Sequence, residues 1–141
     1  MYQNILVPTD GSSLAEEAAE HGIDLAKNYD ATLHVLYVVD MGEIGFTAIP
    51  DDIVETKDLL RGRGEEAVQR IVEMAGDAGV ETVTKVDSGV PSDTIIEYLD
   101  EHDVDLVVMG SRGRSDLSNI VIGSTADRVI RRTDIPVQTI G

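Results

Sequence analysis

The chain has 141 residues, which suits a single domain over residues 1–141 with a sizeable hydrophobic core. It contains no cysteine, so disulfides and thiolate metal sites are excluded. Its 27 acidic and 11 basic side chains give a net charge of −16, which disfavours nucleic acids and anionic membranes as partners. No apolar run approaches the length of a membrane span, and the start lacks the features of a signal peptide, so a soluble cytoplasmic protein is expected.

The acidic excess has two interpretations. Carboxylates at this density repel one another, so the fold should gain from salt that screens them. The composition resembles that of proteins from halophilic cells, which accumulate salt internally. An ordinary acidic cytosolic protein is the alternative, and composition does not separate the two.

Hydrophobic patterning predicts strands and helices in alternation along the whole chain. Short apolar runs predict five strands, at residues 2–8, 31–39, 81–87, 104–109 and 135–140. Helical spacing predicts four helices: from Ser12 or Ser13 to about 27, from 51 to 78, from Pro91 past Leu99, and from 126 to 132. The intervening residues 40–50 are predicted to be a loop long enough to act as a flap. Gly62 and Gly64 are expected to kink or divide the second helix.

Alternation of this kind indicates a five-stranded, parallel, doubly wound α/β sheet with helices on both faces and right-handed crossovers. We predict the strand order 3-2-1-4-5. Ligands bind such sheets beyond the carboxyl ends of the strands, where the strand order reverses. The site is therefore expected between the first and fourth strands, with Asp10 and Gly110 facing each other across one crevice.

The most specific motif lies between the fourth strand and the last helix. Gly110 and Gly113 are followed, after nine residues, by Gly123, Ser124 and Thr125. Phosphate-binding loops are built in this order, because glycine allows close backbone approach and a helix start presents unpaired N–H groups. The Ser124 and Thr125 hydroxyls can cap the helix or donate to a phosphate. The alternative is a glycine-rich connection that binds no ligand.

Basic side chains concentrate around this motif. Residues 112–132 contain five basic and two acidic side chains, whereas the rest of the chain is strongly acidic. Arg112 and Arg114 are placed to lean toward a ligand, which favours a polyphosphate. Arg131 and Arg132 stand at a predicted helix C-terminus, where cations are expected without any ligand.

Asp10 ends the first predicted strand, so its carboxylate can bond a ribose hydroxyl in the crevice. An aspartate before Gly11 is equally typical of a turn. The three histidines have no metal-ligand spacing, and His34 is expected to be packed within its strand. No serine stands in a nucleophile elbow, and no acid–base pair is distinct among so many carboxylates. We therefore assign no catalytic residue and no metal ligand.

These segments resemble the ATP-binding branch of the universal stress protein family over essentially the whole chain. The similarity rests on the glycine signature and on five other segments: Ile5 to Asp10, Leu33 to Val35, Gly89 to Pro91, Met109 to Gly110 and Ile135 to Val137. It implies a Rossmann-like, adenine nucleotide alpha hydrolase-like fold. It also implies a homodimer joined through residues 135–140, whose open edge would otherwise be unprotected.

The resemblance implies a role for each matching residue. Asp10 would meet adenine or ribose, and the backbone of Val35 would meet the adenine edge. Met109 and Gly110 would line the sugar. The phosphates would be surrounded by Gly113, Gly123, Ser124, Thr125 and Ala126. The expected site is completed by Pro8, Thr9 and Arg112.

Three functions remain open. The leading one is an ATP-binding dimeric switch in stress response, with little or no catalysis and with a protein partner that the sequence does not name. The second is a slow ATPase that uses Mg²⁺ held mainly by the phosphates, with Asp10 orienting water. The third is a binding module for another adenine nucleotide.

Overall fold

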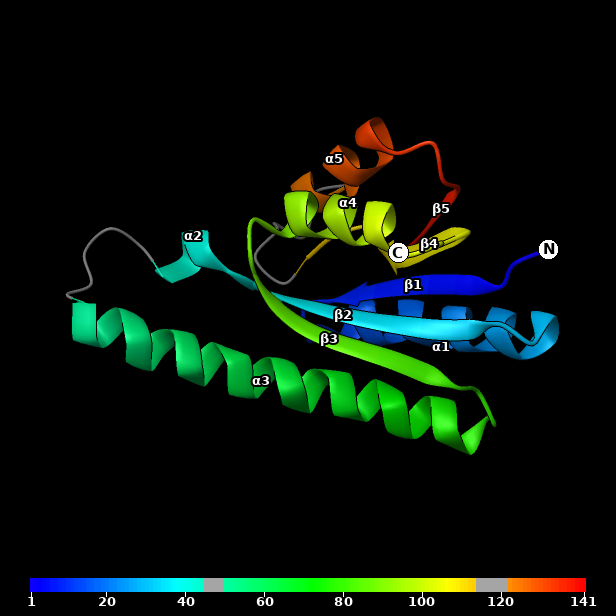
Figure 1. The fold of residues 1–141 in the computed structure, drawn as a ribbon, viewed down its shortest axis with the longest axis horizontal. Coiled ribbons are helices and arrows are strands. Elements are labelled where there is room, and N and C mark those ends of the chain that lie inside the picture. Colours follow the sequence, from blue (N-terminus) through cyan, green and yellow to red (C-terminus); the bar gives the residue numbers. More distant parts are fainter. Residues whose placement is uncertain (45–49, 114–121) are drawn as a thin grey trace.

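The computed structural model describes residues 1–44, 50–113 and 122–141. Strands and helices alternate along them, as Figure 1 shows. The strands are β1 (Asn4–Thr9), β2 (Thr32–Asp40), β3 (Thr82–Gly89), β4 (Leu106–Gly110) and β5 (Val137–Ile140). The helices are α1 (Ser13–Tyr29), α2 (Met41–Ile44), α3 (Pro50–Asp77), α4 (Pro91–Glu101) and α5 (Ser124–Arg132). None of the helices within these ranges is long and apolar enough to cross a bilayer.

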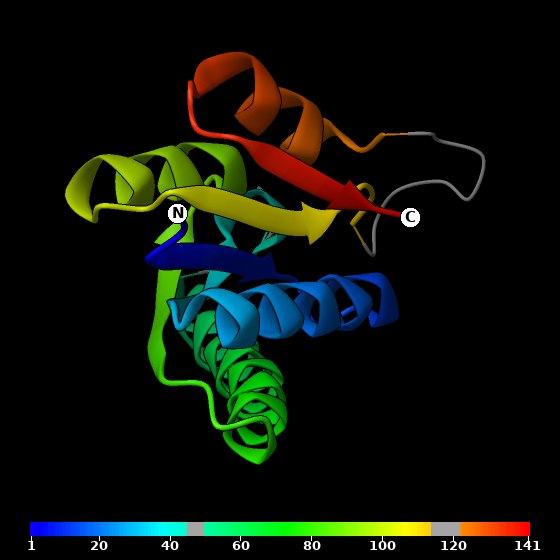
Figure 2. The ribbon, with the colours of Figure 1, turned by 90° about the vertical axis from the view of Figure 1, so that its right-hand side faces the viewer.

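The five strands form one parallel sheet in the order β3-β2-β1-β4-β5. Helices α1 and α3 cover one face, and α4 and α5 cover the other (Figures 1 and 2). The predicted fold class and strand order are therefore confirmed. Because β1 is central, the chain builds outward to β3 and then crosses back to β4. This reversal places the carboxyl ends of β1 and β4 side by side.

Side-chain alternation along the central strands fills two separate cores. On β2, Val35, Tyr37 and Val39 belong to the core beneath α1 and α3, whereas Leu36 belongs to the core beneath α4 and α5. Strands buried on both faces appear in the sequence as continuous apolar runs, which is the pattern that predicted them. The same alternation decides which side chains at the strand ends reach each wall of the site.

The segment between β2 and α3 differs from the predicted loop. Residues 41–44 form the short helix α2, at whose start Asp40 Oδ1 accepts a hydrogen bond from the Gly42 amide at 2.9 Å. A carboxylate that satisfies an amide in this way favours a helical turn. Residues 45–49, within the expected flap, lie outside the described part of the chain.

The starts of two helices test the predicted caps. At α1, the Ala15 amide donates to Ser12 Oγ at 3.2 Å, so the predicted cap is confirmed. At α5, the N-cap is Gly123, which makes no side-chain cap, and the helix begins with Ser124 and Thr125. The expectation that a Ser124 or Thr125 hydroxyl caps this helix is therefore wrong, because both residues already lie inside it.

The glycines of α3 do not divide the helix, which continues through them for 28 residues (Figure 1). Gly64 lies against β2, since a Cβ built on it would come within 2.5 Å of the Tyr37 ring. Gly62 faces open space, with no atom within 4 Å of a Cβ built there. Gly64 is therefore required for packing, whereas Gly62 only lowers the helix propensity.

We expect Gly62→Ala to raise the free energy of unfolding by roughly 1 kcal/mol, because alanine favours a helix interior over glycine. Gly64→Ala should instead lower it by about 1–3 kcal/mol, since the new methyl group would overpack the Tyr37 ring. Urea unfolding of the two variants measures both changes. If both variants gained stability equally, Tyr37 would not be the reason for glycine at position 64.

Candidate functional site

A cavity of about 150 Å³ opens at the carboxyl ends of β1, β2 and β4, where the strand order reverses. This is the position at which doubly wound sheets bind their ligands. The first turns of α4 and α5 and the glycine loop after β4 complete its walls. The cavity therefore lies where the sequence predicted the crevice.

All of the predicted site residues except Val35 line this cavity. The structure brings together Pro8, Thr9, Asp10, Met109, Gly110, Arg112, Gly113, Gly123, Ser124, Thr125 and Ala126. They come from β1, from β4 with its following loop, and from the start of α5, so residues about a hundred positions apart meet at one site.

Val35 lies elsewhere, fully buried in the core beneath α1 and α3. The register explains why: Val35 is level with Val7, whereas Pro8 is level with Leu36 and Thr9 with Tyr37. Val35 thus stands below the level at which β1 reaches the cavity. The end of the same strand lines the cavity instead, through Leu36, Tyr37, Val38 and Asp40.

Sequence reasoning missed eight lining residues: Ala15, Leu36, Tyr37, Val38, Asp40, Pro91, Ile95 and Ser111. The position of Asp40, directly after the apolar run of β2, was a usable signal, because carboxyl ends of parallel strands meet at one edge. Pro91 and Ile95 depend on how α4 packs over the sheet, which the chain pattern alone does not give.

One wall of the cavity is mostly apolar. Leu36 and Val38 project from β2 toward α4, where they meet the core that contains Ile95 and Met109. Pro91, at the first position of α4, extends this wall. A flat, uncharged ring is the kind of group that such a wall accepts.

The opposite wall is the glycine loop, which is held by backbone hydrogen bonds. The Gly123 amide donates to the Ser111 carbonyl at 2.5 Å, and the Ser111 amide donates to the Ile140 carbonyl at 2.8 Å. These bonds draw both ends of the loop onto the end of β5, and Figure 2 shows the last strand reaching this region. The Ser111 hydroxyl is buried without a partner among the described residues.

Three amides at the start of α5 make no hydrogen bond within the part of the chain that the structure describes. They belong to Ser124, Thr125 and Ala126, since the first helical bond runs from the Asp127 amide to the Gly123 carbonyl at 3.0 Å. Unpaired amides at the positive end of a helix favour an anion. Gly123 also lines this wall, but its amide already donates a hydrogen bond to the Ser111 carbonyl.

Asp10 combines the two roles that the sequence left open. Its Oδ1 accepts a hydrogen bond from the Ser12 amide at 3.0 Å, which is turn geometry. The residue is half-buried and lines the same cavity as the glycine loop. The turn thus holds the carboxylate at the cavity instead of competing with a ligand role.

The described basic residues near the motif have different roles: one lines the cavity, and two form ion pairs elsewhere. Arg112 lines the cavity. Arg131 pairs with Asp127 at 3.0 Å within α5, and Arg132 pairs with Asp93 of α4. Both therefore serve the helix C-terminus and its packing rather than the cavity. Arg114 lies outside the described residues.

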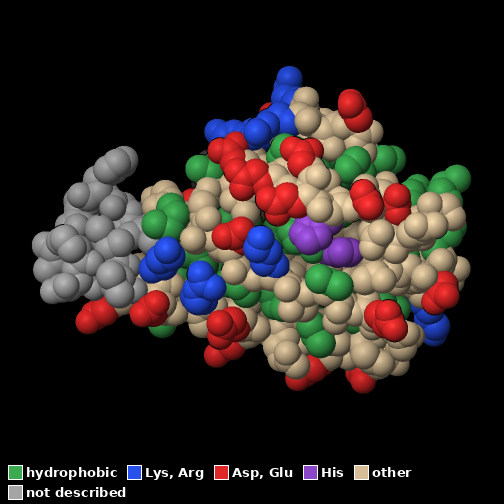
Figure 3. Space-filling view, viewed as in Figure 1, with side chains coloured by type: hydrophobic (Ala, Val, Ile, Leu, Met, Phe, Trp, Pro, Cys, Tyr) green, Lys and Arg blue, Asp and Glu red, His purple; other side chains and the backbone are tan. Residues whose placement is uncertain are grey.

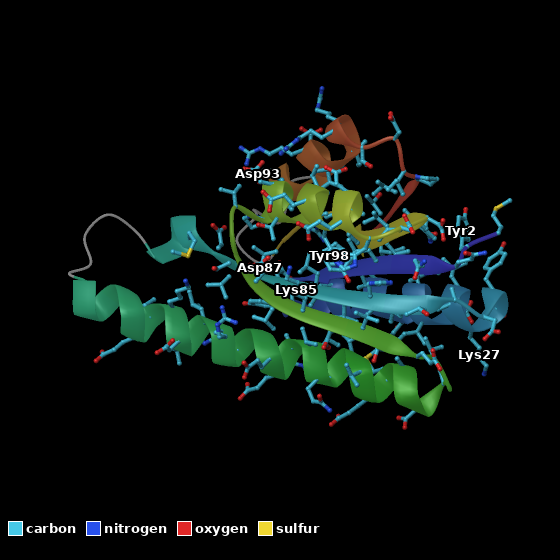
Figure 4. The ribbon with its side chains drawn as sticks, viewed as in Figure 1. Tyr2, Lys27, Lys85, Asp87, Asp93 and Tyr98 are labelled. Atoms are coloured by element: carbon cyan, nitrogen blue, oxygen red, sulfur yellow. The ribbon has the colours of Figure 1, made fainter. Side chains whose placement is uncertain are left out.

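His34 is packed away from the cavity, as predicted. Its Nε2 lies 3.0 Å from Asn4 Oδ1, an acceptor, so Nε2 carries the proton and Nδ1 accepts from the Tyr98 hydroxyl at 2.5 Å. Figure 4 shows Tyr98 between α4 and the sheet, and Figure 3 shows histidine side chains gathered beside α4. Burial lowers the pKa of His34, and the neighbouring His102 lowers it further. The described residues hold no group of three potential metal ligands.

Acid should destabilise the protein through His34. An unfolded histidine takes up its proton near pH 6.5, whereas the lowered pKa keeps folded His34 neutral to a lower pH. The unfolded state then binds more protons, so the free energy of unfolding should fall as the pH drops below about 6.5. Chemical unfolding across a pH series measures the slope. His34→Gln should flatten it, while His21→Gln, at an exposed position of α1, should not; a slope unchanged in His34→Gln would contradict this account.

The fold and the cavity together define a class of doubly wound α/β proteins. In this class, the cavity lies where the strand order reverses, and it is lined by apolar side chains, by a glycine loop and by the amides of a helix start. The model of the universal stress protein family matches residues 1–140. The chain therefore belongs to the universal stress protein family.

Individual relatives agree with this assignment. Universal stress protein MJ0531 of Methanocaldococcus jannaschii is 38% identical over 139 residues, which cover 97% of this chain and 81% of that protein. The structure of universal stress protein UspA from Lactobacillus plantarum matches with a TM-score of 0.91 at 28% identity, over 99% of this chain and 98% of that chain. A universal stress protein from Archaeoglobus fulgidus in complex with dAMP has a TM-score of 0.70 at 24% identity, over 99% and 98% of the two chains; this likeness shows the shared fold alone.

Proposed function

We propose that this protein is an ATP-binding universal stress protein that works as a dimeric, nucleotide-dependent switch in stress response, with little or no catalysis of its own. One observation carries the proposal: the unpaired amides at the start of α5 and the Asp10 carboxylate line the same cavity. Helix-start amides favour phosphates, and a carboxylate at a strand end suits ribose hydroxyls. Together they fit the two ends of a sugar–phosphate unit.

The walls suggest how ATP lies in the cavity. Its phosphates would meet Gly113 and the amides of residues 124–126, and its ribose would lie between Asp10 and Gly110. The base would rest on the apolar wall, where the end of β2 takes the place expected for Val35. Mg²⁺ would be held mainly by the phosphates, since the described residues offer no group of three ligands.

Little or no catalysis is proposed because the described part of the cavity lining offers no clearly placed base. Among the described lining residues, the ionisable side chains are those of Asp10, Tyr37, Asp40 and Arg112, with no histidine, cysteine or lysine. Hydrolysis needs a residue that orients water in line with the leaving group. A slow ATPase in which Asp10 orients water is the alternative, because Asp10 is one of the two carboxylates among the described lining residues.

We propose that β5 pairs with the β5 strand of a second copy. The sheet has two outer strands, β3 and β5. On β3, Lys85 and Asp87 form an ion pair at 3.5 Å (Figure 4), and charges on an edge strand disfavour pairing with another chain. The four residues of β5 carry no charge. The uncharged edge therefore favours a two-fold dimer.

The hydrogen bonds of the loop suggest how ATP could act as a switch. Ser111 bonds Ile140 in β5 and Gly123 at the start of α5. A nucleotide that orders the loop would therefore also affect β5, the strand that is proposed to form the dimer interface. A partner protein that binds only one of the two states would then respond to ATP.

We also infer that the protein works in the cytoplasm of a cell with high internal salt, because its net charge is −16. Screening of carboxylate repulsion should raise the thermal midpoint as KCl increases. Thermal unfolding in low and high KCl measures this. A midpoint that does not rise would remove the inference of a salt-adapted protein.

Calorimetric titration with ATP, ADP, AMP and cyclic AMP, followed by a phosphate-release assay with Mg²⁺, tests the proposed function. We expect ATP to bind and phosphate release to stay at background. Release that rises with protein concentration would favour the slow ATPase instead. Tighter binding of another adenine nucleotide would favour the third function, and no binding by any nucleotide would overturn the proposal.

A further inference from the structure

The last residues of β2 alternate between the two faces of the sheet. Tyr37 and Val39 lie in the core beneath α1 and α3, while Leu36 and Val38 pack toward the core beneath α4 and α5. By the same alternation, Asp40 follows Val38 on the α4 side. Asp40 lines the cavity together with Leu36 and Val38, so it stands at the outer end of the apolar wall.

Asp40 is the one charged side chain that β2 and α4 contribute to the described lining, and the ring of Tyr37, the other β2 lining residue with a polar atom, is packed in the core beneath α1 and α3. The other polar lining side chains come from β1 and its following turn, from the glycine loop or from α5. Those groups surround the proposed sugar and phosphate positions. Asp40 is therefore the charged group that is placed to meet the polar edge of a base lying on the apolar wall.

The hydrogen bonds of Asp40 leave it able to accept from a ligand. Its Oδ1 accepts from the Gly42 amide at 2.9 Å, and no further bond or ion pair to it occurs within the described residues. A carboxylate has two oxygens and accepts several hydrogen bonds, but it donates none. The residue is half-buried, so a partner at the second oxygen would be partly shielded from water.

We propose that Asp40 selects the base of the bound nucleotide by accepting a hydrogen bond from an exocyclic 6-amino group. This inference rests on the proposed function, since it assumes that a nucleotide occupies the cavity. Adenine presents an amino donor at this position, whereas guanine and hypoxanthine present a carbonyl oxygen. A carbonyl facing Asp40 would leave two acceptors opposed and unpaired, which costs binding energy. Asp40 thus makes the site one for 6-amino purines.

ATP and inosine triphosphate (ITP) test this directly, because they share the sugar and the phosphates and differ only in the 6-amino or 6-oxo group and in the hydrogen that N1 of hypoxanthine carries. Wild-type protein should bind ATP about 10 to 100 times more tightly than ITP, the discrimination typical of a good base contact. Asp40→Asn keeps the oxygen that caps α2 and adds an amide that can donate to a carbonyl. Calorimetry should therefore show that the ATP-to-ITP ratio of the variant falls close to one, mainly because ITP binds better.

Asp77→Asn is the matched control, since it removes the same charge at an exposed position at the end of α3. It should leave the ratio unchanged. Equal binding of ATP and ITP by the wild type would overturn the inference, as would a ratio that Asp40→Asn does not alter. If Asp40→Asn weakened both nucleotides equally, Asp40 would act through the α2 cap and not on the base, which also overturns it. Failure of both nucleotides to bind the wild type would instead reject the proposed function.

Discussion

Replacing Gly123 with valine should lower the affinity for ATP by about 100-fold, because the new side chain would deny the phosphates at least two amide hydrogen bonds at the start of α5. Gly123 lines the cavity as the N-cap of α5. Its φ of −79° and ψ of 166° are ordinary extended values that valine adopts readily, so the backbone need not change. Calorimetric titration with ATP measures the loss, and circular dichroism checks that the fold remains.

Gly76→Val is the matched control for this substitution. Position 76 lies in α3 with no atom within 4 Å of a Cβ built on it, so valine fits there without touching the cavity. This variant should bind ATP as the wild type does. Wild-type affinity in Gly123→Val would show that the phosphates do not lie at the start of α5.

Thr139→Pro should convert a dimer into a monomer. The Pro136 carbonyl accepts from Val107 of β4 and the Ile140 carbonyl from Ser111 just after it, so by the alternation of a parallel ladder the amide of Thr139 points toward the open edge. Proline there removes an outward donor and leaves the β4–β5 ladder intact, a position that sheets tolerate. Sedimentation velocity or light scattering should show a halved mass at concentrations where the wild type is dimeric.

Thr84→Pro on β3 is the control at the opposite edge. The Glu81 carbonyl accepts from the Leu33 amide, and the same alternation turns the Thr84 amide outward. Both threonines are exposed, so the two substitutions are alike in kind. Thr84→Pro should leave the dimer intact. A dimer lost in Thr84→Pro but kept in Thr139→Pro would move the interface to β3.

The architecture could be predicted from the sequence because each central strand is buried on both faces. Continuous apolar runs such as Ile5–Val7 and Leu106–Met109 admit few other interpretations. The α3 helix shows the limit of local rules: Gly62 and Gly64 suggested a break, but the helix is continuous and Gly64 lies against the Tyr37 ring. Intrinsic helix propensity contributes little free energy per residue, and tertiary contacts override it.

The candidate site was predictable where one short motif supplies several residues, as in the glycine loop and the start of α5. It was not predictable along β2, where the level of each residue depends on its register with β1. Val35 and Val38 are the same residue type in the same apolar run, yet only Val38 lines the cavity. Likewise, only the structure shows that the Gly123 amide is taken by Ser111, which leaves the next three amides for a ligand.

In the proposed complex, these three amides and Asp10 hold one ATP molecule. Amide chemical shifts of isotope-labelled protein, followed by NMR during titration with ATP, test it most directly. We expect the largest shifts at Ser124, Thr125 and Ala126, together with shifts around Asp10 and the end of β2. Binding of ATP that left these amides unmoved, with the shifts clustered on another surface, would contradict it.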